Sequence, residues 1–323
     1  MRVLLRSVGM LAVGMLALAA VEAGAQAYPS KPIRMIVPQG AGGSTDIWAR
    51  MIAQKMGEAL GQQVVVENRP GAGGIIGVDA AAKAAADGYT ILFGSSTTVA
   101  ANASLYSKVP FDPVKDFTPL AMAIAAPFVI VVNPSVPVNN IRELIALAKS
   151  KPGVLNYGSG TSSAQICTEM FKSLAGVNIT MVPYKSSPQA LTDLAAGQLQ
   201  VLCEPLASAM PQVKAGKLRV LAVTSPNRTG MAPEFPTVAE AGVPGFEYVA
   251  WVAFFAPAGT PRDITAKLSA EILKVLKHPE TIEKLKSTGG EPIPAGAEEL
   301  GAAHKADIAR LAKVIREAGI KAE

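Results

Sequence analysis

Residues 33–68 read IRMIVPQGAGGSTDIWARMIAQKMGEALGQQVVVEN and decide the fold class. The apolar run at 33–37 predicts a strand, and a glycine-rich turn follows it. Apolar residues then recur at helical spacing from Ile47 to Leu60, where Gly61 ends the predicted helix. A strand at 64–66, a helix at 75–86 and a strand at 90–93 complete a βαβαβ unit. Such a unit implies a parallel sheet with helices on both faces.

The same alternation repeats after residue 127, which predicts a second doubly wound lobe. Its strands are expected at 128–132, 155–157, 180–182, 201–203 and 220–223. An apolar run at 249–256 follows, and everything after Pro261 reads as helices only, which would cover the first sheet. The chain would therefore cross between lobes near Ala126–Phe128 and near Trp251–Phe255, with a hinged cleft between them. The expected lobes are 28–127 plus 251–323, and 128–250.

The first 27 residues have the three parts of a secretory signal peptide. Arg2 and Arg6 precede an uncharged apolar run at 8–21, and small residues follow up to Ala27. The run is shorter than the roughly 20 residues that a membrane anchor needs. We expect cleavage near Ala25 or Ala27 and a periplasmic protein.

Two cysteines, Cys167 and Cys203, are present. An even number of cysteines in an oxidising compartment favours a disulfide. Two unpaired, buried thiols are the alternative.

Three loops combine glycine with small hydroxyl residues directly after predicted strands. Residues 38–46 (PQGAGGSTD) and 158–163 (GSGTSS) each join a strand to a helix, one in each lobe, and 94–98 (GSSTT) follows the third strand. Ser44 or Thr45 could cap the first helix, and free N–H groups at a helix start attract a carboxylate or phosphate. Ordinary capped turns are the alternative. Two such loops on opposite lobes predict facing walls of an anion site.

Charged candidates for the cleft are few. Glu204 directly follows a predicted strand and Lys185 follows Tyr184, although both could equally be solvated or paired. The candidate ligand-binding residues are Gln39, Gly40, Gly42, Gly43, Ser44, Thr45, Asp46, Ser95, Ser96, Thr97, Gly160, Thr161, Ser162, Ser163, Lys185 and Glu204.

Other functions find little support in the residues. The basic residues are scattered, which argues against nucleic acid, and residues 71–77 lack the spacing and position of a dinucleotide loop. His278 and His304 are expected at the surface, and no metal or cofactor site is predicted. An exported enzyme would have only Glu204 and Lys185 as cleft catalysts, so we expect no catalysis.

Eight ordered stretches resemble the Bug family, the periplasmic solute receptors of tripartite tricarboxylate transporters. They are YPSKPIRMIVP (28–38), VVVENRPGAGG (64–74), DGYTILFG (87–94), VPFDPVKDFTPL (109–120), LNYGSGTSS (155–163), MVPYKSSPQALTDLAAGQLQV (181–201), AGKLRVLAVTS (215–225) and FFAPAGTP (254–261). The resemblance implies a type II periplasmic-binding-protein fold, with two α/β lobes that close over a small carboxylate. Citrate-like acids, dicarboxylates, acidic amino acids and aromatic acids are the implied ligands. The carboxylate would be held by backbone amides, hydroxyls and water.

The resemblance has departures and leaves alternatives open. Gln39-Gly40-Ala41 stands where many members have an aromatic residue and prolines, and Cys203-Glu204-Pro205 where members often have Phe-Asp-Asn. Both changes bear on which carboxylate is bound. We expect a monomer that delivers its ligand to integral-membrane transporter subunits. A ligand-sensing module for a two-component histidine kinase is the alternative.

Overall fold

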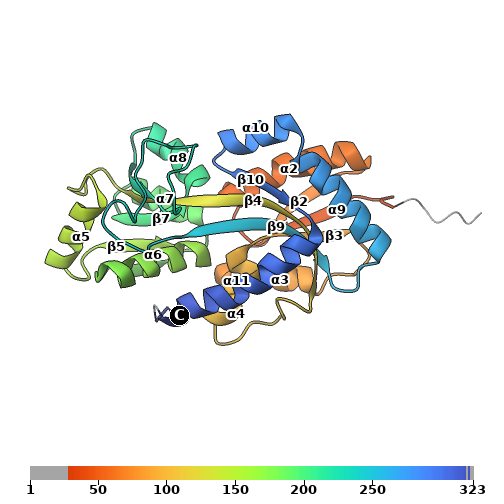
Figure 1. Cartoon of the computed structure of the whole chain (residues 1–323), viewed down its shortest axis with the longest axis horizontal. Coiled ribbons are helices and arrows are strands. Elements are labelled where there is room, and N and C mark those ends of the chain that lie inside the picture. Colours follow the sequence, from red (N-terminus) through yellow and green to blue (C-terminus); the bar gives the residue numbers. More distant parts are fainter. Residues whose placement is uncertain (1–27, 318, 321–323) are drawn as a thin grey trace, which may run out of the picture.

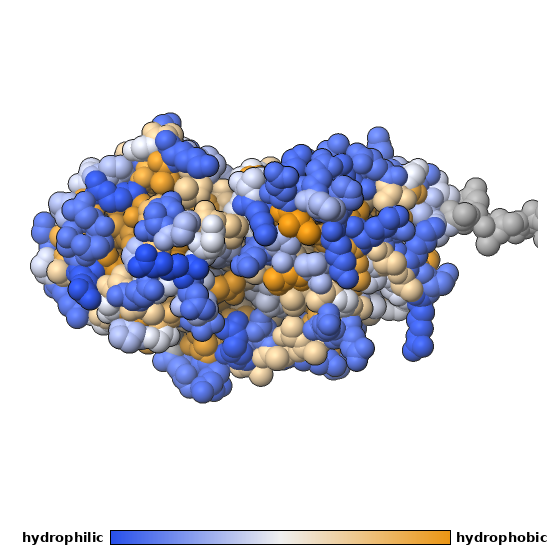
Figure 2. Space-filling model, turned by 45° about the horizontal axis from the view of Figure 1, so that its top comes forward, coloured by the Kyte–Doolittle hydropathy of each residue, from blue (hydrophilic) through white to orange (hydrophobic). Residues whose placement is uncertain are grey.

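The structure is a computed structural model that describes residues 28–317, 319 and 320; the predicted signal peptide lies outside the described residues. No helix in this part of the chain is long and apolar enough to cross a membrane. Two lobes lie side by side, and two long strands run between them (Figure 1). On the face drawn in Figure 2 the same two masses meet at a waist, with hydrophilic side chains mainly toward the margins and apolar ones nearer the middle.

The first lobe is built on three parallel strands, with β1 between β2 and β3. A fourth strand, β9, is antiparallel to β3. Helices α2, α9 and α10 cover one face and α3, α4 and α11 the other (Figure 1). The bounds are β1 Ile33–Val37, β2 Val64–Asn68, β3 Thr90–Ser95, β9 Val249–Pro257, α2 Ser44–Leu60, α3 Ile75–Ala82, α4 Asn102–Leu105, α9 Arg262–Leu276, α10 Pro279–Ser287 and α11 Ala297–Glu317.

The second lobe repeats this plan on strands β7, β5 and β6, which are parallel to one another. Helices α7 and α8 lie on one side of its sheet, and α5 and α6 on the other (Figure 1). The bounds are β5 Asn156–Ser159, β6 Thr180–Pro183, β7 Val201–Pro205, β8 Arg219–Val223, α5 Ile141–Ser150, α6 Ser162–Ala175, α7 Ser187–Ala195 and α8 Leu206–Lys214.

Alternating side chains explain why helices cover both faces of the first sheet. On β1, Met35 joins the buried cluster that contains Trp48 and Ile52 of α2. Its neighbour Ile36 joins a separate cluster that contains Val78 of α3. Because successive residues of a strand point to opposite faces, a strand that is apolar throughout requires helices on both sides.

Strand β4, Phe117–Val132, belongs to both lobes. Residues 117–127 pair with β9, and residues 128–132 pair with β7. At the change of partner, the Thr224 hydroxyl lies 2.7 Å from the carbonyl oxygen of Tyr248, just before β9. The same hydroxyl accepts a hydrogen bond from the Phe128 N–H at 3.1 Å. One buried threonine therefore joins the two strands where they pass between the lobes.

The expectation that the chain is purely helical after Pro261 is wrong. Residues Glu291–Ala295 form β10, which is antiparallel to β4. This segment reads EPIPA, and its two prolines hide the strand pattern. Proline is tolerated at a sheet edge because an edge strand need not donate every ladder hydrogen bond. Helix α3 also stops at Ala82, four residues before the predicted end.

A disulfide joins Cys167 on α6 to Cys203 on β7, with 6.1 Å between the Cα atoms. The predicted pairing is confirmed, and the alternative of two unpaired thiols is wrong. The bridge fixes helix α6 to β7, the strand that also carries Glu204.

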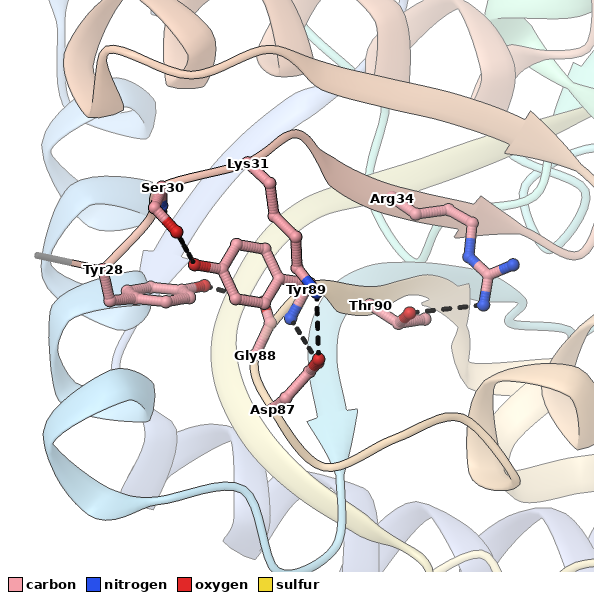
Figure 3. Close-up of polar contacts among 8 residues, drawn as sticks. All are labelled: Tyr28, Ser30, Lys31, Arg34, Asp87, Gly88, Tyr89 and Thr90. Carbon is pink, nitrogen blue, oxygen red and sulfur yellow. Dashed lines mark hydrogen bonds and ion pairs between the residues drawn. The ribbon is translucent and has the colours of Figure 1, made fainter. Parts of the chain in front are cut away.

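The first described residues are held against the turn before β3 (Figure 3). The Tyr28 hydroxyl donates to the carbonyl oxygen of Gly88 at 2.7 Å, and the Ser30 N–H donates to the Tyr89 hydroxyl at 2.9 Å. Gly88 has φ +81°, and a Cβ there would contact Ile264 and Tyr28. Only glycine fits this contact without strain.

Candidate ligand-binding cleft

Two adjoining cavities lie between the lobes, and the one lined by the connecting strands β4 and β9 is called the inner cavity. The outer cavity has a volume of about 320 Å³ and the inner one about 40 Å³, and Gln39, Gly40 and Thr161 line both. The outer cavity is also lined by Pro38, Pro70, Gly71, Ala72, Gly73, Gly74, Tyr106, Ser159, Gly160, Ser162, Gln165, Met181, Pro183, Tyr184 and Lys185. The inner cavity is also lined by Gly43, Ser44, Thr45, Trp48, Ser95, Ala126, Phe128, Ser163, Ser187, Pro188, Pro205, Ser208, Ala250 and Val252.

The loop before α2 forms part of the first lobe's wall. Its helix is capped at Gly43 with no side-chain hydrogen bond, so the expectation that Ser44 or Thr45 caps it is wrong. Their side chains line the inner cavity instead. Asp46 turns back and accepts from the Gly42 N–H at 2.9 Å. Gly42 has φ +80°, a conformation that glycine adopts without strain.

The loop before α6 forms the opposite wall and caps itself. The Thr161 side chain accepts from the Ala164 N–H at 3.2 Å. The next two residues reach the other lobe: the Ser162 hydroxyl donates to the carbonyl oxygen of Gly73 at 3.2 Å, and Ser163 hydrogen-bonds Thr97. In the opposite direction, the Ser44 N–H donates to the Ser208 hydroxyl at 3.0 Å. The two lobes are thus in polar contact around the cavities.

The third predicted loop is a tightly bonded turn. Gln39 Nε2 donates to the Ser95 hydroxyl at 3.3 Å, and that hydroxyl lies 2.9 Å from the Thr97 hydroxyl. The Ser96 hydroxyl accepts from the Trp251 N–H at 3.4 Å. Of the three predicted residues of this loop, Ser95 lines the inner cavity, whereas Ser96 and Thr97 line neither. Their hydroxyls position the wall.

Sequence reasoning missed the loop at residues 71–74 as part of the cleft. It rejected these glycines as a nucleotide site, but they line the outer cavity beside Tyr106. A Cβ on Gly73, which has φ +61°, would collide with Ser162 and with the Tyr106 hydroxyl 2.5 Å away. A glycine loop at the carboxyl end of β2 was the available signal, because ligands bind beyond strand ends in such sheets. Ser187 and Ser208 were missed because only the packing of α7 and α8 brings them to the cavity.

Lys185 is the charged residue among those that line the two cavities. Asp46 lines neither, and hydrogen bonds from Arg50 and Gly42 outweigh burial and hold its pKa below the usual 3.8. Glu204 is fully buried behind the inner cavity, where it forms a hydrogen bond with the Ser187 hydroxyl at 3.0 Å. Burial raises the pKa of Glu204 to about 8 against the opposing effect of this bond. The walls are therefore mainly hydroxyl, backbone and apolar groups.

One of the two histidines is not where it was expected. His304 is 3 % exposed, and its Nε2 lies 2.9 Å from the carbonyl oxygen of Val99. It packs edge-on against Trp251 and Phe255, and burial lowers its pKa below 6.5. These contacts attach α11 to β9 and to the segment around Val99 in the first lobe. Within residues 28–317 and 319–320, no cluster of histidine, cysteine or acidic residues could hold a metal ion.

Two doubly wound lobes, two connecting strands and a cleft walled from both sides define a two-lobed solute-binding protein. The chain belongs to the family described as Tripartite tricarboxylate transporter family receptor, which its sequence matches over residues 48–320. The predicted resemblance and the type II periplasmic-binding-protein fold are confirmed. The family consists of periplasmic receptors, not enzymes.

Known relatives cover almost the whole chain. Protein BugT of Bordetella pertussis is 39% identical over 300 residues, which are 92% of this chain and 92% of BugT. The R. palustris protein Rpa4515, solved with adipate, is 37% identical with a TM-score of 0.89, and the match covers 91% of this chain and 99% of that one. MatC from Rhodopseudomonas palustris, solved with bound malate, is 31% identical with a TM-score of 0.85. The match covers 89% of this chain and 100% of MatC.

Proposed function

We propose that this receptor captures a small acid with a carboxylate at each end, in the two adjoining cavities between its lobes. The observation that carries the proposal is the polar lining of these cavities from both lobes, with Lys185 as its charged side chain. Hydroxyls and backbone N–H groups at the starts of α2 and α6 are suited to a carboxylate. Adipate and malate, found in similar proteins, are acids of this shape.

The ligand would stabilise the closed arrangement because it contacts both lobes at once. Thr45 and Ser95 offer hydroxyls from the first lobe, and Thr161 and Ser163 from the second. We infer lobes of residues 28–127 plus 251–323, and 128–250, with β4 and β9 as the hinge. The change of pairing partner at Pro127 and Phe128 supports this division.

We infer that residues 1–27 are removed on export, with cleavage near Ala25 or Ala27. The contacts of Tyr28 and Ser30 in Figure 3 hold these residues in the first lobe, which supports a mature chain that includes them. The family description supports integral-membrane transporter subunits as the partner of the liganded receptor. We expect the receptor to act as a monomer.

Isothermal titration with protein freed of co-purified ligand tests the proposed ligand class. The panel should hold adipate, malate, citrate, glutamate and benzoate. We expect the dicarboxylates to bind, and acids with one carboxylate to bind more weakly because one end of the site then stays unpaired. Silence across the whole panel would refute carboxylate capture. Gene deletion then separates the roles: lost uptake supports transport, whereas lost transcriptional induction with intact uptake would favour sensing.

A further inference from the structure

Glu204 is a buried acid that the proposed binding mode leaves without a role. It stands near the end of β7 and is 0% exposed. One carboxyl oxygen, Oε1, lies 3.0 Å from the Ser187 hydroxyl oxygen, within hydrogen-bond distance, and the other, Oε2, has no hydrogen-bond partner among the described residues. A buried carboxyl with one unpartnered oxygen is costly as an anion, which favours the protonated form.

Among the described residues, no charged neighbour compensates for this burial. Strand β4 carries no charged residue, and β5 carries only Tyr157 as a titratable group. On α6, Glu169 pairs with Lys172 and accepts from the Tyr157 hydroxyl. On α7, Asp193 accepts from the Tyr184 hydroxyl. The remaining charges on nearby elements are the exposed Lys214 of α8 and Lys185 of the loop before α7.

Ser187 connects this acid to the ligand site. It is the first residue of α7, and both it and the next residue, Pro188, line the inner cavity. A hydroxyl has one proton to donate. If Ser187 donates to Glu204, it can only accept from a ligand; if Glu204 donates to Ser187, the hydroxyl proton is available to the cavity.

We propose that Glu204 is a positioning residue which, when protonated, donates to Ser187 and so turns the Ser187 hydroxyl into a donor for a ligand carboxylate. The inference rests on the proposed function of the cleft. Loss of the Glu204 proton has two consequences that act in the same direction. Ser187 then donates to Glu204 and presents a lone pair to the ligand, and a buried negative charge stands behind the cavity. Both weaken the binding of an anion.

The pKa of Glu204, which burial raises to about 8, places this change just above neutral pH. Carboxylic acids are fully ionised there and do not change charge. We therefore expect tight binding at about pH 6.5 and weaker binding at about pH 9. The expected loss is roughly tenfold to a hundredfold in affinity, as for one hydrogen bond to a charged group.

The decisive experiment compares titrations of adipate and malate at these two pH values in the wild type, Glu204→Gln and Glu247→Gln. Glutamine keeps a donor for Ser187 at every pH, so we expect Glu204→Gln to bind with the same affinity at both. Glu247 is exposed in the same lobe and serves as the matched control; its variant should keep the wild-type pH dependence. A wild type without pH dependence, or Glu204→Gln with the full dependence, overturns the proposal.

Unfolding measurements separate failure of this inference from failure of the proposed function. The folded protein holds the Glu204 proton between pH 4.5 and about 8, whereas the unfolded chain releases it. Wild-type stability should therefore fall relative to Glu204→Gln as the pH rises through this range. If no acid of the panel binds at any pH, carboxylate capture fails, and the unfolding comparison still decides whether Glu204 is protonated. If the difference in stability between wild type and Glu204→Gln stays the same from pH 4.5 to about 8, Glu204 is not protonated in the folded protein.

Discussion

The two loops that wall the cleft share a sequence pattern but are supported differently. In the first lobe, the loop before α2 has no side-chain cap, and the second lobe's Ser208 satisfies its Ser44 N–H. In the second lobe, the loop before α6 caps itself through Thr161, and its Ser162 hydroxyl reaches Gly73 across the cleft. The first loop thus depends on the opposite lobe, whereas the second is complete within its own lobe and supplies contacts outward.

Because of this difference, the two loops should respond differently when the cleft opens and closes. A self-capped loop keeps its shape when the lobes separate. When the cleft opens, a loop whose N–H group donates to the other lobe loses that acceptor, and water must replace it. We therefore expect changes in the packing of the second loop within its own lobe to affect mainly stability. Changes in the first loop, and changes at contacts between the lobes, should affect mainly closure and binding.

The largest expected effect is on the support of the second loop. Removing the bridge with Cys167→Ala and Cys203→Ala should lower the free energy of unfolding by about 3–4 kcal/mol, the entropy of closing a loop of this length. Urea unfolding of the double variant and of the oxidised wild type measures the difference. Equal urea midpoints in the two proteins would show that the bridge does not stabilise the fold. Two alkyl groups on each unreduced wild-type molecule would show that the bridge does not form.

Two glycines that face the same residue give the sharpest test of the comparison. A Cβ on Gly40 would lie 2.7 Å from the Ser186 Cβ across the cleft, whereas a Cβ on Gly160 would collide with the Ser186 backbone within its own lobe. Overpacking costs about 1–3 kcal/mol. We expect Gly160→Ala to lower the free energy of unfolding by about 1–3 kcal/mol, because its clash lies within one lobe. Gly40→Ala should weaken ligand binding by about the same free energy, because its clash opposes closure of the cleft.

Gly296→Ala is the matched control, since nothing lies within 4 Å of a Cβ there. Urea unfolding and calorimetric titration on the three variants separate the two effects. If both cleft variants lose stability equally and bind equally well, the two loops do not differ in the way described.

Hydroxyl removal should have a smaller effect on affinity. Thr45→Ala removes a hydroxyl from the inner cavity, and Ser162→Ala removes the bond to the Gly73 carbonyl oxygen. We expect each to weaken carboxylate binding by about 1–2 kcal/mol, with Thr45→Ala the larger because its bond would be to a charged group. Ser287→Ala removes an exposed helix hydroxyl as control. Unchanged affinity in both cleft variants would mean that other groups hold the ligand.

The lobes could be predicted because their information is local. Alternation of strands and helices is visible in short windows such as residues 33–68, and the loops after β1 and β5 carry their glycines and hydroxyls in sequence. Which lobe satisfies the Ser44 N–H is not local, since it depends on Ser208, 164 residues away. The same limit applies to Ser187, which is placed by the packing of α7.

Charged residues were harder to place than loops. Glu204 was expected directly after a strand, but β7 continues to Pro205 and Glu204 lies within it. Its full burial depends on α7 and α8, which the strand pattern does not describe. Asp46, one of the predicted ligand-binding residues, lines neither cavity, and its carboxylate accepts from the Gly42 N–H. His304 was expected at the surface because a single histidine in a polar helix does not reveal which face contacts Val99.

The smallest expected effect concerns Asp46, whose response to pH is opposite to that of Glu204. Hydrogen bonds from Arg50 and from the Gly42 N–H outweigh its burial and hold its pKa below 3.8. Its carboxylate therefore stabilises the folded state above about pH 4, and this contribution is lost as the pH falls through the folded-state pKa. Asp46→Asn should be less stable than the wild type by about 1 kcal/mol at neutral pH.

Urea unfolding at about pH 7, 5 and 3 tests this sign, with Asp263→Asn as an exposed control that should follow the wild type. The gap between wild type and Asp46→Asn should narrow at the lowest pH, where the wild-type carboxyl becomes protonated. If the difference in unfolding free energy instead grew toward low pH, the Asp46 carboxylate would not stabilise the folded state in the way described. Because the first loop would lose support in acid and Glu204 of the second lobe would gain a charge in alkali, the cleft should bind anions best between these limits. The wall of the first lobe sets the lower limit and the wall of the second lobe sets the upper one.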